Sequence, residues 1–160
     1  MSNTKNNIYI GVVGASLLAS ITLWEGNRTV PYLDPVGIPT VCSGITENVD
    51  MKKVYTKQEC EKLNKEAIAE YGKGMLKCIN VPISRNEYEA YTRFGYNIGI
   101  ANACQSLAIK ELNNGRHTEA CYRISTSPSG SPVWAYAGGK YFKGLENRRK
   151  DETATCLRPD

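Results

Sequence analysis

The sequence is poor in residues that bind metals. It has one histidine, His117, and none of its six cysteines forms a C-x-x-C pair. Protein zinc sites usually combine several cysteine and histidine ligands at short spacing. The sequence therefore predicts neither a metal site nor a cofactor.

A basic stripe is also missing, and no nucleic-acid-binding motif is present. The formal net charge of +4 is spread along the 160 residues. Proteins that bind DNA or RNA usually concentrate positive charge on one face or one helix. We therefore expect no nucleic-acid partner. The charge alone indicates only a globular protein that stays in solution, although it would also suit an anionic polymer or a membrane surface.

Charge is nearly absent from the first 24 residues, where only Lys5 is charged and residues 6–24 form an uncharged run. A helix needs about 20 residues to cross a bilayer, but glycine, alanine and serine dilute this run. A cleaved signal peptide, a stable anchor and a soluble helix with Leu17, Ile21 and Trp24 on one face are the alternatives. We favour an uncleaved export segment that is held weakly in the membrane.

The six cysteines are spaced widely along the chain. An even number of scattered cysteines favours three disulfides in an oxidising compartment over six buried thiols. The pairing cannot be deduced from the sequence alone. The disulfide candidates are Cys42, Cys60, Cys78, Cys104, Cys121 and Cys156.

The remaining pattern predicts an α+β fold in which helix dominates. Residues 26–50 alternate glycine and proline with short β-prone pieces, which indicates a small irregular sheet. The segments "TKQE" and "SRNE" have the spacing of capping boxes and predict helices from Thr56 and Ser84. Further helices are expected from about Ala103 to the "NNG" stop, around residues 118–124, and from Gly144 to near Cys156.

Two carboxylates and a hydroxyl lie close together in the turn-rich segment. Glu25 follows Trp24 and an apolar stretch, which would raise the pKa of the carboxyl group. Asp34 is expected in a more solvated turn, and Thr40 offers a hydroxyl that could hold water. Glycosidic bond cleavage uses two carboxylates in such different environments. On spacing alone, ordinary surface carboxylates remain the better interpretation.

The segment "WEGNRTVPYLDPVGIPT" resembles the phage-type lysozymes and endolysins of glycoside hydrolase family 24. The segments "FGYNIG" (residues 94–99) and "KGLENRR" (residues 143–149) are similar to that family in sequence, order and spacing. The resemblance extends from Trp24 to Leu157. It implies a lysozyme-like fold with a small β-containing lobe at about 25–70, a larger helical lobe at about 71–160, and an active-site cleft between them.

The resemblance also implies the chemistry. Glu25 would be the general acid, and Asp34 would act with Thr40 on the attacking water. Cleavage, with inversion, would fall on the β-1,4 bond between N-acetylmuramic acid and N-acetylglucosamine in peptidoglycan glycan strands. The supporting residues would be Tyr32 and Asn97, which line the cleft, and Arg148, which pairs with Glu25.

One subgroup of these endolysins carries a signal-arrest-release segment, which residues 1–24 resemble. This implies that residues 8–23 hold a monomeric enzyme on the periplasmic face of the host inner membrane before its release into the periplasm. Cysteine is absent from these residues, so control by refolding after release is the better hypothesis. Within the lobes, a hypothetical pairing joins Cys42 to Cys60, Cys121 to Cys156, and Cys78 to Cys104.

Two other functions remain open. A lytic transglycosylase also cuts peptidoglycan, but it uses one acid and forms an anhydro-sugar, and the Glu–Asp–Thr set argues against it. A catalytically inactive protein that binds the wall or regulates lysis would have no need of intact Glu25, Asp34 and Thr40.

The leader gives a testable prediction. Residues 1–24, fused ahead of a periplasmic reporter, should yield an uncleaved product that fractionates with the inner membrane. A weakly apolar helix can be exported and held in the membrane, although it is less hydrophobic than a permanent anchor. Immunoblots of membrane and periplasmic fractions measure this, with the reporter lacking the leader as the control. Finding only a shortened, soluble product would reject the prediction.

Overall fold

The computed structural model describes residues 17–160. The predictions for residues 1–16, including most of the expected membrane segment 8–23, lie outside the described residues. The chain divides into two compact units between Glu70 and Tyr71. Each unit is described by itself.

The first described segment, residues 17–25, is helical. Leu17 and Ile21 are buried, and Trp24 is half-buried, so the side of the helix that the sequence marked as apolar is covered by protein. No helix within residues 17–160 has both the length and the apolar character needed to cross a bilayer.

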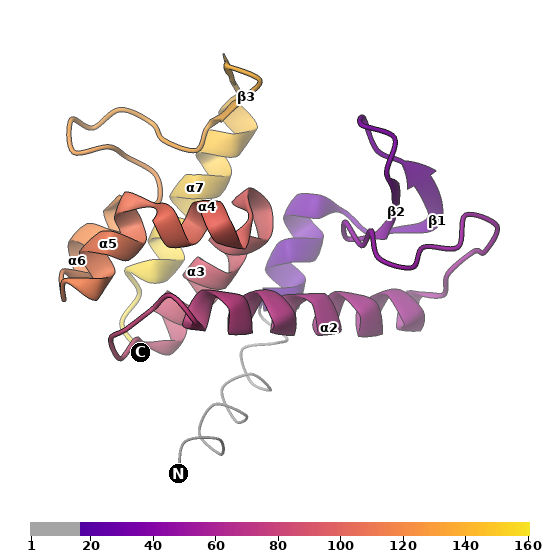
Figure 1. Cartoon of the computed structure of the whole chain (residues 1–160), viewed down its shortest axis with the longest axis horizontal. Helices are drawn as coiled ribbons and strands as arrows, with labels where there is room; N and C mark the ends of the chain where they lie inside the picture. Colours follow the sequence, from indigo (N-terminus) through magenta and orange to yellow (C-terminus); the bar gives the residue numbers. More distant parts are fainter. Residues whose placement is uncertain (1–16) are drawn as a thin grey trace, which may run out of the picture. The chain divides into compact units, whose positions relative to one another are not determined.

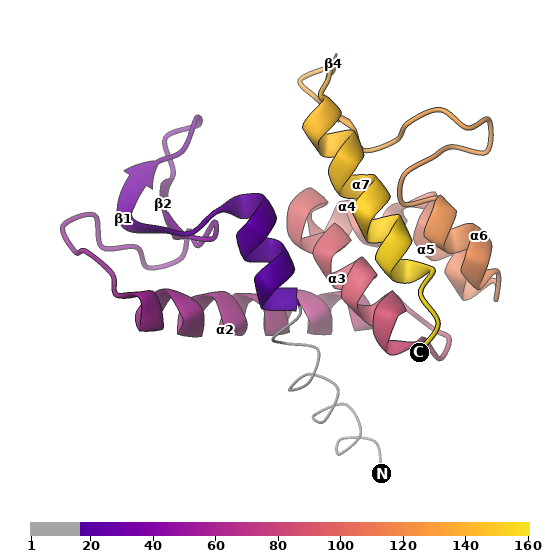
Figure 2. The ribbon, with the colours of Figure 1, turned by 180° about the vertical axis from the view of Figure 1, so that it is seen from behind.

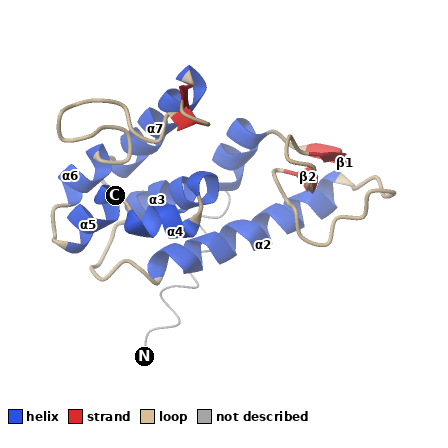
Figure 3. Ribbon diagram, turned by 45° about the horizontal axis from the view of Figure 1, so that its top comes forward, coloured by secondary structure: helices blue, strands red, loops and turns tan. Residues whose placement is uncertain are grey.

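A two-stranded antiparallel sheet follows, as predicted, and is drawn in red beside the label β1 in Figure 3. It consists of β1 (Arg28–Leu33) and β2 (Pro39–Cys42). Tyr32 pairs with Thr40 and Leu33 with Pro39, and an irregularity interrupts the register between Arg28 and Tyr32. The turn between the strands places Gly37 at a positive φ of 82°, which a side chain at Cβ would disfavour.

Helix α2 (Lys57–Leu76) begins at the predicted capping box. Glu59 N–H donates to Thr56 Oγ1 over 3.1 Å, and Thr56 N–H donates to Glu59 Oε2 over 2.8 Å. Cys60 is bonded to Cys42 and closes a small core with Val41, Ile45 and Tyr55.

The buried side of α2 differs from the apolar stripe that helical spacing alone would give, which runs through Cys60, Leu63, Ala67 and Tyr71. The fully buried positions are Cys60, Asn64, Ile68, Gly72 and Met75. The sequence pattern missed this side because Asn64 and Gly72 are not apolar, although tertiary contacts bury both.

The second unit begins with the end of α2 and continues with helices that Figure 1 shows in magenta to orange. Helix α3 (Arg85–Ile98) starts at the second predicted capping box, formed by Ser84 and Glu87. Gly99, at a φ of 89°, ends it and opens α4 (Ile100–Gln105). One helix was expected from Ala103 to the "NNG" stop, and this was wrong: the serine at position 106 ends α4 and caps α5 (Leu107–Asn113) with its hydroxyl.

Helix α6 (His117–Tyr122) is followed by a loop and by a short hairpin of β3 (Tyr136–Ala137) and β4 (Lys140–Tyr141). The segment "AGGK" (residues 137–140) carries a turn signal in the sequence but none for strands. Helix α7 (Lys143–Cys156) then packs along α3, as the view from behind shows (Figure 2). The core of this unit gathers around Tyr91 and Phe94 of α3.

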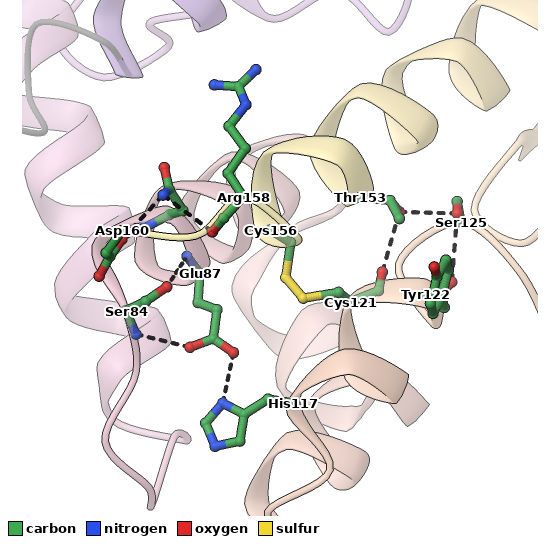
Figure 4. The surroundings of a disulfide bond; sticks show 11 residues. Ser84, Glu87, His117, Cys121, Tyr122, Ser125, Thr153, Cys156, Arg158 and Asp160 are labelled. Carbon is green, nitrogen blue, oxygen red and sulfur yellow. Dashed lines mark hydrogen bonds and ion pairs between the residues drawn. A yellow bond between two sulfur atoms is a disulfide. The ribbon is translucent and has the colours of Figure 1, made fainter.

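The three disulfides are Cys42–Cys60, Cys78–Cys104 and Cys121–Cys156, the same pairs as in the hypothesis from the sequence. Figure 4 shows the last of them joining α6 to the end of α7. Beside it, Thr153 Oγ1 donates to the Cys121 carbonyl oxygen over 3.2 Å. Glu87 lies nearby and bridges the Ser84 amide to Nδ1 of His117 at 2.6 Å.

Packing at one helical glycine gives a stability prediction. A Cβ at Gly95 would lie 2.6 Å from Met75 Sδ, and Met75 is buried, so it cannot swing into solvent. Gly95→Ala should lower the free energy of unfolding by about 1–3 kcal/mol through overpacking, less the gain of about 1 kcal/mol in helix propensity. Gly144→Ala in α7, where a Cβ meets nothing within 4 Å, is the matched control and should leave stability unchanged or slightly raised. Urea denaturation of both variants measures this, and equal midpoints would contradict it.

Candidate active site

Glu25 is the last residue of the first helical segment and is exposed. The apolar surroundings expected for it from the sequence are therefore not found. The reason is local: the chain leaves the helix directly after Glu25, at Gly26, whose φ is 76° and whose N–H donates to the Thr22 carbonyl oxygen over 2.9 Å. The carboxylate consequently stands at a chain reversal rather than within a packed helix face.

Asp34 and Thr40 meet at the peptide groups of Ile38. Asp34 Oδ1 accepts hydrogen bonds from Val36 N–H at 2.9 Å and from Ile38 N–H at 2.8 Å. The Ile38 carbonyl oxygen accepts from Asp34 N–H at 3.0 Å and from Thr40 Oγ1 at 3.0 Å. One residue of the hairpin turn, Ile38, therefore fixes both side chains. The exposed turn around Ile38 is held by hydrogen bonds rather than by apolar packing.

These bonds leave specific acceptor sites open. Asp34 Oδ1 is occupied by two amides, while Asp34 Oδ2 has no hydrogen bond to the described part of the chain. Thr40 is buried and its hydroxyl hydrogen is used on Ile38, so its oxygen can still accept. Both oxygens therefore keep lone pairs that no hydrogen bond within the described part of the chain uses.

Tyr32 lies on β1 opposite Thr40 in the register of the sheet. The guanidinium of Arg28 stacks over its ring at 4.5 Å from the centroid. The stacked cation restrains the ring, and such a cation–π contact contributes about 0.5–1 kcal/mol at exposed sites. The structure thus brings Tyr32, Asp34 and Thr40 into one hairpin, and it places Glu25 in the same unit.

A buried polar contact ties this hairpin to α2. Asn64 Oδ1 accepts from Ser43 N–H at 3.1 Å, and Asn64 Nδ2 donates to Ser43 Oγ over 3.2 Å. Ser43 Oγ in turn donates to the Gly26 carbonyl oxygen over 2.6 Å. Because Gly26 follows Glu25 directly, this chain of bonds fixes the backbone beside the candidate acid.

The other two predicted residues belong to the second unit, Asn97 to α3 and Arg148 to α7. Arg148 is buried, and its Nε lies 3.7 Å from Glu152 Oε1. Its predicted pairing with Glu25 stays a prediction. Asn97 Oδ1 accepts a hydrogen bond of 2.8 Å from Nη1 of Arg149, a residue that the sequence analysis did not single out.

Arg149 and Glu152 form a fully buried ion pair with 2.7 Å between Nη2 and Oε1. Burial raises the pKa of Glu152 and lowers that of Arg149, and the attraction between the two charges opposes both shifts. The guanidinium stays charged, as arginine does in proteins. Arg149 Nε and Glu152 Oε2 are buried without a hydrogen bond to residues 17–160, so the pair is held at a cost in desolvation.

Neither a metal-binding group within residues 17–160 nor the cavity at α5 and α6 involves these residues. Within residues 17–160, no group of three or more His, Cys, Asp or Glu side chains could hold a metal ion. A cavity of about 830 Å³ lies at α5 and α6 and is lined by Glu111, Arg116, His117 and Glu119 among others. Glu111 is paired with Arg116, so these two charges of the cavity neutralise each other. The cavity includes none of the candidate active-site residues.

Comparison with known proteins decides the family. Residues 22–152 match the family model for phage lysozyme. The chain belongs to the phage lysozyme family. The SAR-endolysin of Pseudomonas phage phiKMV is 35% identical over 153 residues, which cover 93% of this chain and 91% of that protein.

Solved structures agree on the fold. The muramidase domain of SpmX from Asticaccaulis excentricus has a TM-score of 0.77 at 22% identity, covering 90% of this chain and 96% of that chain. An endolysin from Escherichia coli O157:H7 phage FAHEc1 has a TM-score of 0.72 at 28% identity, covering 88% and 90%. The predicted α+β, lysozyme-like fold is confirmed, and the chain is a phage endolysin that resembles the signal-arrest-release subgroup.

Sequence reasoning missed Ser43, Asn64, Arg149 and Glu152. Asn64 carried a usable signal, because it lies four residues after Cys60 and so interrupts the buried side of α2 with a carboxamide. Arg149 and Glu152 carried none, since a charged helix normally turns such residues to solvent.

The contact of Asn64 with Ser43 gives a prediction for this phage lysozyme family member. Asn64→Leu leaves the buried Ser43 amide without its acceptor, which should lower the free energy of unfolding by about 1–3 kcal/mol. Lys65→Leu is the matched control: Lys65 is exposed and, among residues 17–160, its side chain is bonded to Glu61 alone, so its loss should cost less than about 1 kcal/mol. Chemical denaturation measures both, and an Asn64→Leu variant as stable as Lys65→Leu would show that the contact does not hold the hairpin.

Proposed function

We propose that the protein is a muramidase that hydrolyses the β-1,4 bond between N-acetylmuramic acid and N-acetylglucosamine in peptidoglycan, during phage-mediated lysis of the host. Membership of the phage lysozyme family supports this. The observation that carries the proposal is the shared anchoring of Asp34 and Thr40 on Ile38, which leaves two acceptor oxygens of one hairpin open to a water molecule.

Glu25 is the general acid in this proposal. Its carboxyl group donates a proton to the glycosidic oxygen as the bond to the anomeric carbon breaks. The exposed position of Glu25 at the end of its helix leaves it open to a substrate. The backbone beside it is restrained by the bond from Ser43 to Gly26, so the acid is held without being buried.

The attacking water is held by Asp34 and Thr40. It donates one hydrogen to Asp34 Oδ2 and the other to Thr40 Oγ1, so that a lone pair of its oxygen is free to attack the anomeric carbon. The new bond forms as the proton passes to Asp34, and the configuration at that carbon is inverted. Afterwards Asp34 loses the proton to solvent and Glu25 regains one.

Three further residues are proposed to support the substrate or the acid. Tyr32 offers an aromatic face steadied by Arg28, and aromatic rings pack well against apolar sugar faces. Asn97 offers a carboxamide. Arg148 lies on α7 and is proposed to steady the ionised form of Glu25 after proton transfer.

The proposed place of action is the periplasm. Residues 8–23 would first tether the monomeric enzyme to the inner membrane as a signal-arrest-release segment, and the enzyme would be active after release. The sequence of residues 1–24 and the similarity to the SAR-endolysin of Pseudomonas phage phiKMV support this.

The proposal predicts loss of lysis on removing either carboxylate. Glu25→Gln removes the proton donor and Asp34→Asn removes the proton acceptor, and each should lower the rate by at least about 10²-fold. Turbidity of permeabilised Gram-negative cells measures the rate. Glu47→Gln, at an exposed residue outside the candidate site, is the matched control and should retain full activity.

The products distinguish the remaining alternatives. Hydrolysis leaves reducing ends on the muropeptides, whereas a lytic transglycosylase would leave anhydro ends, and mass spectrometry separates the two. Full lysis by Glu25→Gln would reject the catalytic proposal and favour an inactive wall-binding or lysis-regulating protein.

A further inference from the structure

The orientation of the Asn97 carboxamide is fixed by chemistry. Arg149 Nη1 lies 2.8 Å from the Asn97 side chain. A guanidinium has only donors, so the atom that faces it must be the carbonyl oxygen Oδ1 and not the NH₂ group. The NH₂ group of Asn97 therefore points away from Arg149, and it makes no hydrogen bond to any residue that the structure describes.

Arg149 itself cannot move to release this amide. Its side chain is fully buried, it is bonded to the equally buried Glu152, and it lies over the Phe94 ring at 5.4 Å from the centroid. Turning the Asn97 amide over would set its NH₂ group against the guanidinium and would leave Nη1 buried without an acceptor, which is unfavourable.

The pair is not needed to join α3 to α7. Arg93 of α3 already donates to Thr155 Oγ1 of α7 over 3.0 Å and pairs with Asp151, and the Cys121–Cys156 bond fixes the end of α7. A buried ion pair that leaves two polar atoms unsatisfied is a poor way to add stability. Its geometry instead serves the residue that it touches, Asn97.

We propose that Arg149, oriented by Glu152, is a positioning residue that locks Asn97 as a hydrogen-bond donor toward substrate, and that the group it recognises is the acetamido carbonyl oxygen of an N-acetylhexosamine. This rests on the proposed function, which supplies the glycan. Among the groups of these sugars, a hydroxyl can donate or accept, whereas the acetamido carbonyl can only accept. A fixed donor can bond any sugar oxygen, but the amide carbonyl is the strongest neutral acceptor among them, so the acetamido carbonyl is the group we expect it to hold.

Asn97→Asp tests this most directly. The carboxylate keeps the bond to Arg149, now charge-assisted, but presents an acceptor where the NH₂ group was. The probes are the tetrasaccharide of N-acetylglucosamine and its de-N-acetylated counterpart, titrated calorimetrically into the Glu25→Gln protein at a fixed salt concentration. The protein with Asn97 intact should bind the acetylated probe more tightly than the de-N-acetylated probe. Asn97→Asp should weaken binding of the acetylated probe roughly 10-fold without loss of thermal stability.

Two further variants separate positioning from a purely structural role. Asn80→Asp, at an exposed residue of the same unit, repeats the charge change and should leave binding unchanged. Arg149→Met combined with Glu152→Leu removes both charges of the pair at once, and the amide becomes free to turn. Because buried Arg148 also lies 3.7 Å from Glu152, thermal denaturation of this variant checks that the fold is retained. The preference for the acetylated probe should then shrink, and it should return in part in Arg149→Lys with Glu152 intact.

The outcomes are distinct from those of the lysis assay. Equal affinity for the acetylated probe in the proteins with Asn97 and with Asn97→Asp would overturn the inference. An unchanged preference for the acetylated probe in the Arg149→Met, Glu152→Leu variant would also overturn it. A protein that shows the acetamido preference but fails to release reducing ends from peptidoglycan would overturn the proposed function and leave this inference standing.

Discussion

The buried carboxamide of Asn64 is the contact on which the candidate catalytic hairpin depends. It satisfies both the amide and the hydroxyl of Ser43, and the hydroxyl then holds the carbonyl of Gly26 beside Glu25. The Cys42–Cys60 bond anchors the neighbouring residue to the same helix. A two-stranded hairpin is marginal by itself, so α2 supplies the rigidity that the hairpin lacks alone.

Within the hairpin, the hydrogen bonds of one turn fix both candidate side chains, Asp34 and Thr40. Asp34 caps the turn with Oδ1, and Ile38 accepts from both Asp34 and Thr40. The same bonds that close the turn decide which lone pairs stay open. In the second unit, buried charge has a comparable effect: Arg149 and Glu152 determine how the carboxamide of Asn97 is turned, because a guanidinium accepts no hydrogen bond.

Local signals in the sequence predicted local structure well. The capping boxes at Thr56 and Ser84 both form, because such a motif is closed by residues three apart and needs no tertiary partner. Ser106 shows the limit: its hydroxyl both ends α4 and caps α5, and the apolar pattern on either side continues as if one helix ran through. The apolar pattern did not give the buried side of α2 for a related reason, since Asn64 is buried against a partner 21 residues away in the sequence.

The sequence by itself determined the family, the α+β fold class and the order of Glu25, Asp34 and Thr40, because these depend on residue identity and spacing along the chain. Spacing without the family resemblance would have left the two carboxylates as ordinary surface groups. Only the tertiary structure decided that Glu25 is exposed, that Asp34 and Thr40 share Ile38, and that Arg149 is buried against Asn97. Burial and hydrogen bonding are set by which distant segments meet, and a one-dimensional pattern does not contain that information.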